Sequence, residues 1–221
     1  MILSLLLLNM AHADTQLWMK TAYRKKVLPK THIKFSQHLR LEDNLTAIES
    51  IIPELEIIWK GVPWFDVVPG YRLFWRRTKN DTLELAQRGH LDVQRDWSLT
   101  KKLDIRYRMR LQARQELDET DVDYGMRHKV GWEYDAPKRW RPNGFVEYYI
   151  TDDGRDKFQV GLGSKYKLRK RNRVGVRLVW ERFVTTRPDN FIIMMGYEYR
   201  ASKKKKKNKN KKNKETKKKE P

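Results

Sequence analysis

The chain has 221 residues, contains no cysteine and carries a formal net charge of +21. The lack of cysteine excludes disulfides and thiolate metal sites. The sequence contains no run of 18 apolar residues, so it predicts no transmembrane helix. The segment after Arg200 holds 12 Lys and 2 Glu, so it carries +10 and leaves +11 on the body. Such a charge predicts an anionic partner, which composition alone does not identify.

The first 13 residues have the pattern of a secretory signal. An apolar run at 2–8 is followed by Ala11-His12-Ala13, which matches the small-residue cleavage site of such signals. The basic residues that normally precede the run are missing, so we expect a truncated signal peptide at 1–13 and a mature chain from Asp14. The alternative is a buried apolar segment. A signal without a spanning helix predicts a protein of the periplasm, the outer membrane or the cell exterior.

From there onward, apolar and polar residues alternate along much of the chain. Successive side chains of a strand point to opposite faces, so this period of two predicts strands with one apolar and one polar face. The pattern is clear at 33–41, 65–76, 85–93, 103–114, 124–134, 158–166, 173–180 and 191–200. A further candidate is 16–27, whereas 51–59 and 144–150 fit less cleanly. Pro53 and Pro69 are unfavourable inside paired strands.

The segment 103–114 is the most informative of these strands. Arginines at 106, 108, 110 and 114 lie on one face, and apolar side chains from Leu103 to Ala113 lie on the other. Its 12 residues suit a tilted strand that crosses a bilayer, which needs roughly 9–11 residues. A line of arginines is costly in a protein core but ordinary in the polar interior of a membrane barrel.

The breakers between strands alternate between two kinds. Tight turns are expected at 28–30, 61–63, 96–98 and 171–172, and longer loops at 42–50, 77–82, 115–121, 151–156 and 185–190. This rhythm is typical of an up-and-down barrel with short turns at one rim and longer loops at the other. Trp and Tyr near the predicted strand ends fit the aromatic girdles of such barrels.

We therefore predict an all-β fold, a closed antiparallel up-and-down transmembrane β-barrel of about 10–12 strands at 14–200. Eleven candidate strands are counted, but single-chain bacterial barrels close with an even number, so we expect ten or twelve. The Lys-rich segment 201–221 cannot bury apolar area and is expected to be a disordered tail.

These features resemble an uncharacterised family of bacterial outer-membrane barrels catalogued as domain of unknown function 2490. The resemblance covers about 16–200. It rests on Gln16-Leu17-Trp18, Pro69-Gly70-Tyr71-Arg72, the arginine-alternating segment 105–114, Phe145-Val146-Glu147 and the closing G-Y-x-Y at 196–199. The family implies a closed outer-membrane barrel and no established activity. The Lys tail departs from the family's usual end near the last strand.

No motif predicts catalysis, a cofactor or a metal. The chain lacks a Gly-rich phosphate loop, a G-x-S-x-G elbow and an H-E-x-x-H pair. By parity His32, His38 and His90 share the charged face, and His128 lies on the other. The charged residues expected to face the lumen are Asp104, Arg106, Arg108, Arg110, Arg127, Lys129, Glu133, Arg177 and Glu198. Buried charges need partners, so these residues either pair and plug the lumen or line a path for small anions.

We expect a non-catalytic barrel of the bacterial outer membrane that acts as a narrow anion-preferring pore or as a binding or structural barrel. Its expected partners are outer-membrane lipid and small anions in the lumen, with the Lys tail in the periplasm on anionic lipid or cell-wall polymer. The alternatives are a lipid-modifying barrel enzyme and a soluble basic nucleic-acid-binding protein. Nucleic acid is disfavoured because a stacking platform needs aromatic and basic residues on one face.

Overall fold

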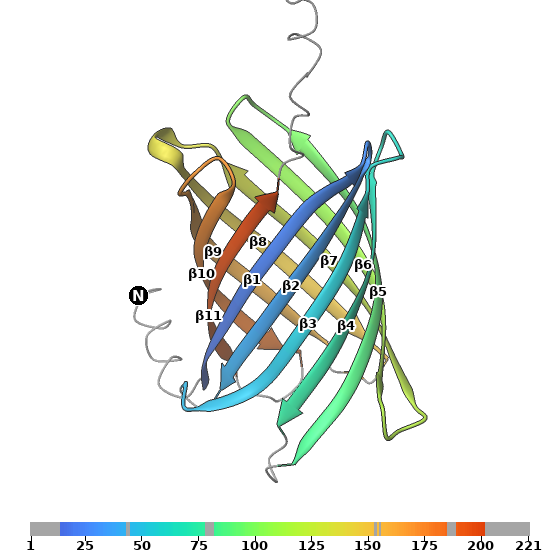
Figure 1. Cartoon of the computed structure of the whole chain (residues 1–221). Coiled ribbons are helices and arrows are strands. Elements are labelled where there is room, and N and C mark those ends of the chain that lie inside the picture. Colours follow the sequence, from blue (N-terminus) through green and yellow to red (C-terminus); the bar gives the residue numbers. More distant parts are fainter. Residues whose placement is uncertain are drawn as a thin grey trace, which may run out of the picture.

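The strands expected from the sequence form one closed barrel in the computed structural model (Figure 1). The structure describes residues 14–42, 45–77, 82–152, 154, 156–184 and 189–201. Its strands are β1 (Asp14–Leu28), β2 (Thr31–Glu42), β3 (Ala47–Trp59), β4 (Asp66–Arg77), β5 (Leu83–Ser98), β6 (Leu103–Glu116), β7 (Val122–Tyr134), β8 (Trp140–Thr151), β9 (Lys157–Lys167), β10 (Asn172–Phe183) and β11 (Asn190–Ala201). The predicted signal and the tail beyond Ala201 lie outside the described residues.

The barrel confirms the predicted fold class and corrects the expected strand number. Each strand pairs antiparallel with the next, and the ring closes through β1 and β11. The count is eleven, so the expectation of an even number is wrong. In a meander with an odd number of strands, the first and last run in the same direction and can pair only in parallel. A parallel ladder is slightly less stable per residue, which is a modest cost for closing the sheet.

The odd strand number separates the two ends of the described chain. The β1–β11 register runs from Asp14 opposite Asn190 to Lys25 opposite Ala201. Asp14 therefore begins β1 at one rim, and β11 ends at the other (Figure 1).

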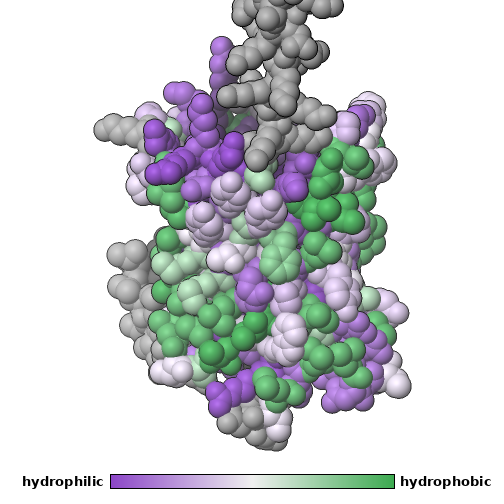
Figure 2. Space-filling model, in the orientation of Figure 1, coloured by the Kyte–Doolittle hydropathy of each residue, from purple (hydrophilic) through white to green (hydrophobic). Residues whose placement is uncertain are grey.

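The outer wall is apolar and the interior is polar, the reverse of a soluble protein. In β6, Arg110 is 1 % exposed whereas its neighbour Leu111 is 46 % exposed. Figure 2 shows large apolar side chains over the strands on one face, with hydrophilic side chains gathered at the upper rim and at the lower right. Lipid can solvate such an exterior, because it removes the apolar side chains from water. No helix among the described residues is long and apolar enough to cross a membrane.

Most of the exposed tryptophans of the described residues lie at one rim, whereas Trp75, near the end of β4, lies at the other. Trp59 and Trp97 lie at the ends of β3 and β5, Trp132 near the end of β7, and Trp140 at the start of β8. These strand ends all belong to the rim where β1 turns into β2. Amphipathic rings favour the headgroup level of a bilayer, so this ring of tryptophans indicates a membrane interface at that rim.

The two segments with the weaker alternation form full strands. Their alternation is blurred because some interior positions are apolar: Ile52 and Ile58 on β3 and Phe145 on β8 are buried. Pro53 and Pro69 lie in strands at positions where the sheet tolerates proline. Pro53 and the position opposite Pro69 both fall at gaps in the β3–β4 register, where a missing N–H donor costs least.

The predicted contrast between short turns and long loops is wrong. Connections contain two to six residues at one rim and four to six at the other. The turn expected at 96–98 is also displaced. The β5 strand continues to Ser98, and the turn follows it, where Thr100 Oγ1 accepts hydrogen bonds from the amides of Lys102 and Leu103.

A disulfide engineered across the parallel seam tests the closure. Thr21 lies opposite Tyr197, and the chain has no other cysteine to interfere. We expect Thr21→Cys with Tyr197→Cys to oxidise readily, because directly opposed residues lie within the Cα separation that a disulfide allows. Mobility on a non-reducing gel reads out the cross-link. Thr21→Cys with Met195→Cys, offset by two residues, is the matched control. Equal cross-linking of both pairs, or of neither, would contradict this register.

Candidate functional site

The barrel encloses a cavity of about 700 Å³ lined by residues from all eleven strands. We call this space the lumen cavity. Its wall carries fifteen Arg and Lys side chains but six Asp and Glu side chains. The excess of nine basic groups gives the interior a positive potential, which a wall of low dielectric strengthens.

The lumen cavity lies where interior side chains are small. Gly175 and Gly196 contribute to its wall on β10 and β11. A Cβ added at Gly196 would come no nearer than 3.9 Å to another heavy atom, the backbone oxygen of Lys20. The opposite part of the barrel, along β3 to β6, is filled instead by long charged side chains. Side-chain size on the inner face therefore determines where space remains open.

The filled part is an ion-pair cluster built on three buried acids, Glu54 and Glu56 of β3 and Asp92 of β5. Glu54 is bonded by Arg72, by Lys20 Nζ at 3.1 Å and by His38 Nε2 at 3.0 Å. We call the whole set the β3–β6 cluster, after the strands that carry its acids and arginines. It consists of Glu54, Glu56, Arg72, His90, Asp92 and Arg110 on those strands, together with Lys20 from β1 and Lys34 and His38 from β2.

The same cluster continues toward β6. Lys34 Nζ lies 2.5 Å from Glu56 Oε2. Arg110 holds Asp92 with two hydrogen bonds, from Nε at 2.5 Å and from Nη2 at 2.8 Å. Such a two-pronged pair is the strongest form of the Arg–carboxylate contact. Each acid of the cluster therefore has a cationic partner, as burial of charge requires.

The β3–β6 cluster also contains a group that resembles a metal site. Ligand atoms of Glu54, Glu56 and His90 lie within 4.8 Å of one another, and all three residues are buried. The surroundings do not fit a cation, however. The three acids of the cluster already face four permanent cations, Lys20, Lys34, Arg72 and Arg110. A divalent ion would add to a local positive excess, so we assign these residues to charge pairing.

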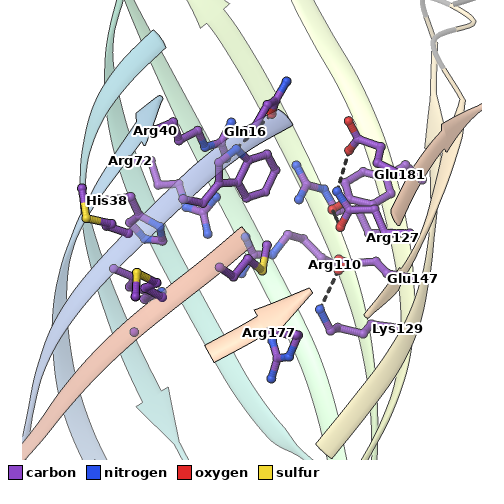
Figure 3. Close-up of a pocket in the computed structure, with 18 of the residues that line it drawn as sticks. Gln16, His38, Arg40, Arg72, Arg110, Arg127, Lys129, Glu147, Arg177 and Glu181 are labelled. Carbon is purple, nitrogen blue, oxygen red and sulfur yellow. Dashed lines mark hydrogen bonds and ion pairs between the residues drawn. The ribbon is translucent and has the colours of Figure 1, made fainter. Parts of the chain in front are cut away.

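The position of the acids explains the charge of the lumen cavity. Glu54, Glu56 and Asp92 do not reach its wall, whereas their partners Arg72 and Arg110 do. In Figure 3, Arg72 and His38 lie on one side of the space, and Arg127, Glu147 and Lys129 lie on the other. Cations therefore screen the acids from the space they surround.

A second network crosses the lumen from β6 to β8. Glu147 accepts hydrogen bonds from Arg108 Nη2 and Lys129 Nζ, both at 2.7 Å. Arg177 on β10 donates to Asn143 Oδ1, at 2.5 Å from Nη2. A chain of polar contacts on β8 to β10 completes the network, with Tyr149 donating to Gln159, and Gln159 and Lys157 donating to Glu181.

Six of the residues expected in the lumen line the cavity, namely Arg108, Arg110, Arg127, Lys129, Arg177 and Glu198. Three do not line it. Arg106 is exposed and pairs with Asp96, Asp104 accepts a hydrogen bond from Ser98 Oγ, and Glu133 is bonded by Arg141 and Lys165. These three lie within a few residues of a strand end. Parity gives the face of a side chain but not its depth along the barrel.

Asp92 was expected from the sequence to pair with the lumen arginines, and Arg110 binds it. Glu54, Glu56, Glu147 and Glu181 were not expected to pair there. Glu54, Glu56 and Glu147 lie on the two strands with the weaker alternation, and Glu181 lies one residue beyond the predicted end of its strand. The signal that could have found them is the Glu54–Glu56 spacing of two, which places both carboxylates on one face.

The histidines follow their predicted faces. His38 and His90 point inward, within 3.0 and 4.0 Å of Glu54 carboxylate oxygens. His128 lies on the outer face, where its Nδ1 is 2.7 Å from the hydroxyl of Tyr107. Across the described ranges, no histidine is hydrogen-bonded to a serine or threonine hydroxyl, the pairing that an activated nucleophile needs.

Comparisons with known proteins give one family match and several similar solved structures. The family model described as protein of unknown function (DUF2490) matches residues 15–191. No curated protein matches the chain. Among solved structures, a loop L8 deletion mutant of OmpT, an outer membrane protein of Vibrio cholerae, is 17% identical with a TM-score of 0.46 over 79% of this chain. An anion-selective porin from Comamonas acidovorans is 9% identical with a TM-score of 0.41 over 82%. The chain spans 60% and 55% of those two chains.

Removal of one acid tests whether the β3–β6 cluster holds the barrel together. Glu54→Gln leaves Lys20 and Arg72 without their carboxylate, so we expect a loss of about 3–5 kcal/mol in unfolding free energy. The temperature at which the folded gel band disappears measures the effect. The control is Asp96→Asn, which removes the partner of the exposed Arg106 and should cost about 0–1 kcal/mol. Similar losses of unfolding free energy in both variants would show that the buried ion pairs of the cluster stabilise the barrel no more than an exposed ion pair does.

Proposed function

The chain belongs to the family of proteins of unknown function DUF2490, and from that premise we propose that it is a non-catalytic barrel of the bacterial outer membrane whose lumen admits small anions in preference to cations. The observation that carries the proposal is the wall of the lumen cavity, with its excess of nine basic side chains. A permanent positive field concentrates anions and repels cations at the narrowest part of a path.

The ion pairs inside the barrel favour a narrow path rather than a wide channel. The β3–β6 cluster fills one side of the lumen with buried side chains, so passage is confined to the lumen cavity. The cations that face this space belong to several strands, and Arg72, Arg127 and Arg177 approach it from different sides (Figure 3). An ion that crosses the barrel would remain near positive charge throughout its path.

The outer wall supports the proposed location. Apolar side chains face outward along the strands, and most of the exposed tryptophans lie at one rim, in keeping with the lipid-facing belts and aromatic girdles of membrane barrels. The proposed partner of this surface is outer-membrane lipid. The Lys-rich tail, proposed to lie in the periplasm on anionic lipid or cell-wall polymer, would place the rim where β11 ends on the periplasmic side.

The two other functions considered from the sequence receive less support. A lipid-modifying enzyme needs a hydroxyl or thiol activated by a base, whereas His38 and His90 lie beside carboxylates and His128 is bonded to a tyrosine. A nucleic-acid platform needs arginines beside exposed aromatic rings. Here the lumen arginines and the outward-facing tryptophans lie on opposite faces of the wall.

Ion selectivity in a planar bilayer tests the proposal. Under a KCl gradient, we expect the reversal potential to have the sign of the chloride equilibrium potential. Arg173→Glu with Arg177→Glu lowers the excess on the cavity wall from nine to five and should move the reversal potential toward zero. A wild-type potential with the sign of potassium would overturn the proposal.

A change of size without a change of charge is the matched control. Gly196→Leu adds volume to the lumen cavity at a position where a Cβ has room. We expect a lower single-channel conductance and an unchanged sign of the reversal potential, because the wall keeps its charge. A conductance equal to that of the wild type would show that current does not pass through this cavity.

A further inference from the structure

Arginines face one another across neighbouring strands in the wall of the lumen. Arg88 on β5 lies directly opposite Arg72 on β4 and Arg114 on β6. Arg110 on β6 lies directly opposite Arg127 on β7. Opposed residues of antiparallel strands have Cβ atoms roughly 4.5–5.5 Å apart, and like charges in that relation destabilise a sheet. Such pairings need an explanation.

Three of these five arginines are neutralised by acids. Arg72 is bonded to Glu54, Arg110 holds Asp92, and Arg114 donates to Glu116 at 2.8 Å. Arg88 and Arg127 differ, since neither has an acidic partner among the described residues. The charge of Glu147 acts on Arg127, but this carboxylate is already bonded by Arg108 and Lys129. Neither Arg88 nor Arg127 therefore has an ion pair of its own among the described residues.

Arg88 and Arg127 share three further features. Each guanidinium lies over an aromatic ring, Arg88 at 4.7 Å from the centroid of Phe74 and Arg127 at 4.3 Å from that of Tyr149. The Nε atom of each is buried and has no hydrogen-bond partner among the described residues. Both side chains line the lumen cavity, where the charge of Arg127 acts on Arg88 more strongly than that of the directly opposed Arg72.

In this arrangement, the N–H donors of the two guanidinium groups lack an acceptor among the described residues. A ring that lies against a guanidinium supports its flat face, while the N–H donors around its edge remain available. A buried donor without an acceptor is costly. A guanidinium edge matches the oxygens of phosphate, to which it donates two parallel hydrogen bonds.

We propose that Arg88 and Arg127 form a binding site in the lumen for a dianionic tetrahedral oxyanion, either inorganic phosphate or the phosphate group of a small monoester. The site rests on the proposed function, because the ligand must enter the lumen. Two guanidinium groups that form no ion pair of their own favour a ligand with two negative charges. A phosphate monoester carries about −1.5 to −2 near pH 7, whereas chloride carries one charge and cannot accept a bidentate pair.

Thermal unfolding and calorimetry of the folded barrel in detergent test this site. The probes are inorganic phosphate, ethyl phosphate and sodium chloride at equal ionic strength. We expect both phosphates to bind saturably, with a Kd below about 1 mM, and to raise the unfolding temperature, because a ligand of the folded state stabilises it. Saturation by inorganic phosphate with no response to ethyl phosphate would identify the free ion as the ligand. A stronger response to ethyl phosphate would identify monoesters. An equal response to chloride would overturn the site.

Substitutions assign the binding to these residues. Arg88→Gln and Arg127→Gln should each weaken phosphate binding by about tenfold or more, since a charge-assisted bidentate contact is lost. Without phosphate, neither variant should unfold at a lower temperature than the wild type, because each removes a like-charge opposition. An arginine that only stabilised the wall would give the opposite result. Phosphate affinity unchanged in both variants would overturn the proposal.

Two more variants complete the test. Arg127→Lys keeps the charge but loses the planar fork, so it should bind phosphate with intermediate affinity even if a glutamine variant fails to fold. Arg106→Gln is the matched control, because Arg106 is exposed and lies outside the lumen cavity; it should bind phosphate like the wild type. Chloride-selective current without saturable phosphate binding would remove the site and leave the proposed function. Saturable phosphate binding without current would remove the proposed function and leave the site.

Discussion

Charge pairing inside the barrel is the constraint on which the rest of this structure depends. A closed sheet sends every second side chain inward, and in this chain many of those side chains are charged. Glu54, Asp92 and Glu147 each join cations from other strands, so the pairs connect adjacent strands and strands that are next but one. The same pairs fill one side of the interior, and the small residues of β10 and β11 leave the other side open.

The positive lumen follows from how these pairs are layered. The acids of the β3–β6 cluster lie deep against the wall, and their cationic partners Arg72 and Arg110 stand between them and the cavity. An ion in the lumen therefore meets cations first. The proposed anion preference and the proposed oxyanion site have this common origin, but they depend on different residues. The first depends on the sum of charges, and the second depends on Arg88 and Arg127.

Much of the fold could be predicted from the period of two, because alternation records which side chains face lipid and which face the lumen. The segment 103–114 alone indicated a membrane barrel. The strand number could not be predicted, since closure through a parallel pair depends on how distant strands meet. Glu54 and Glu147 were not predicted to be lumen acids, because Ile52, Ile58 and Phe145 interrupt the polar face of their strands. Arg106 and Asp104 lie on the expected face but near the rim, since parity contains no information on depth.

The most direct test of a membrane barrel is fractionation of the cell envelope, followed by gel electrophoresis of the outer-membrane fraction with and without boiling. A closed barrel held by continuous strand pairing and buried ion pairs resists detergent until it is heated. We expect a band in the outer-membrane fraction that changes its mobility on boiling. A protein recovered in the soluble fraction, with the same mobility before and after boiling, would contradict the barrel, its lumen and both proposals that depend on it.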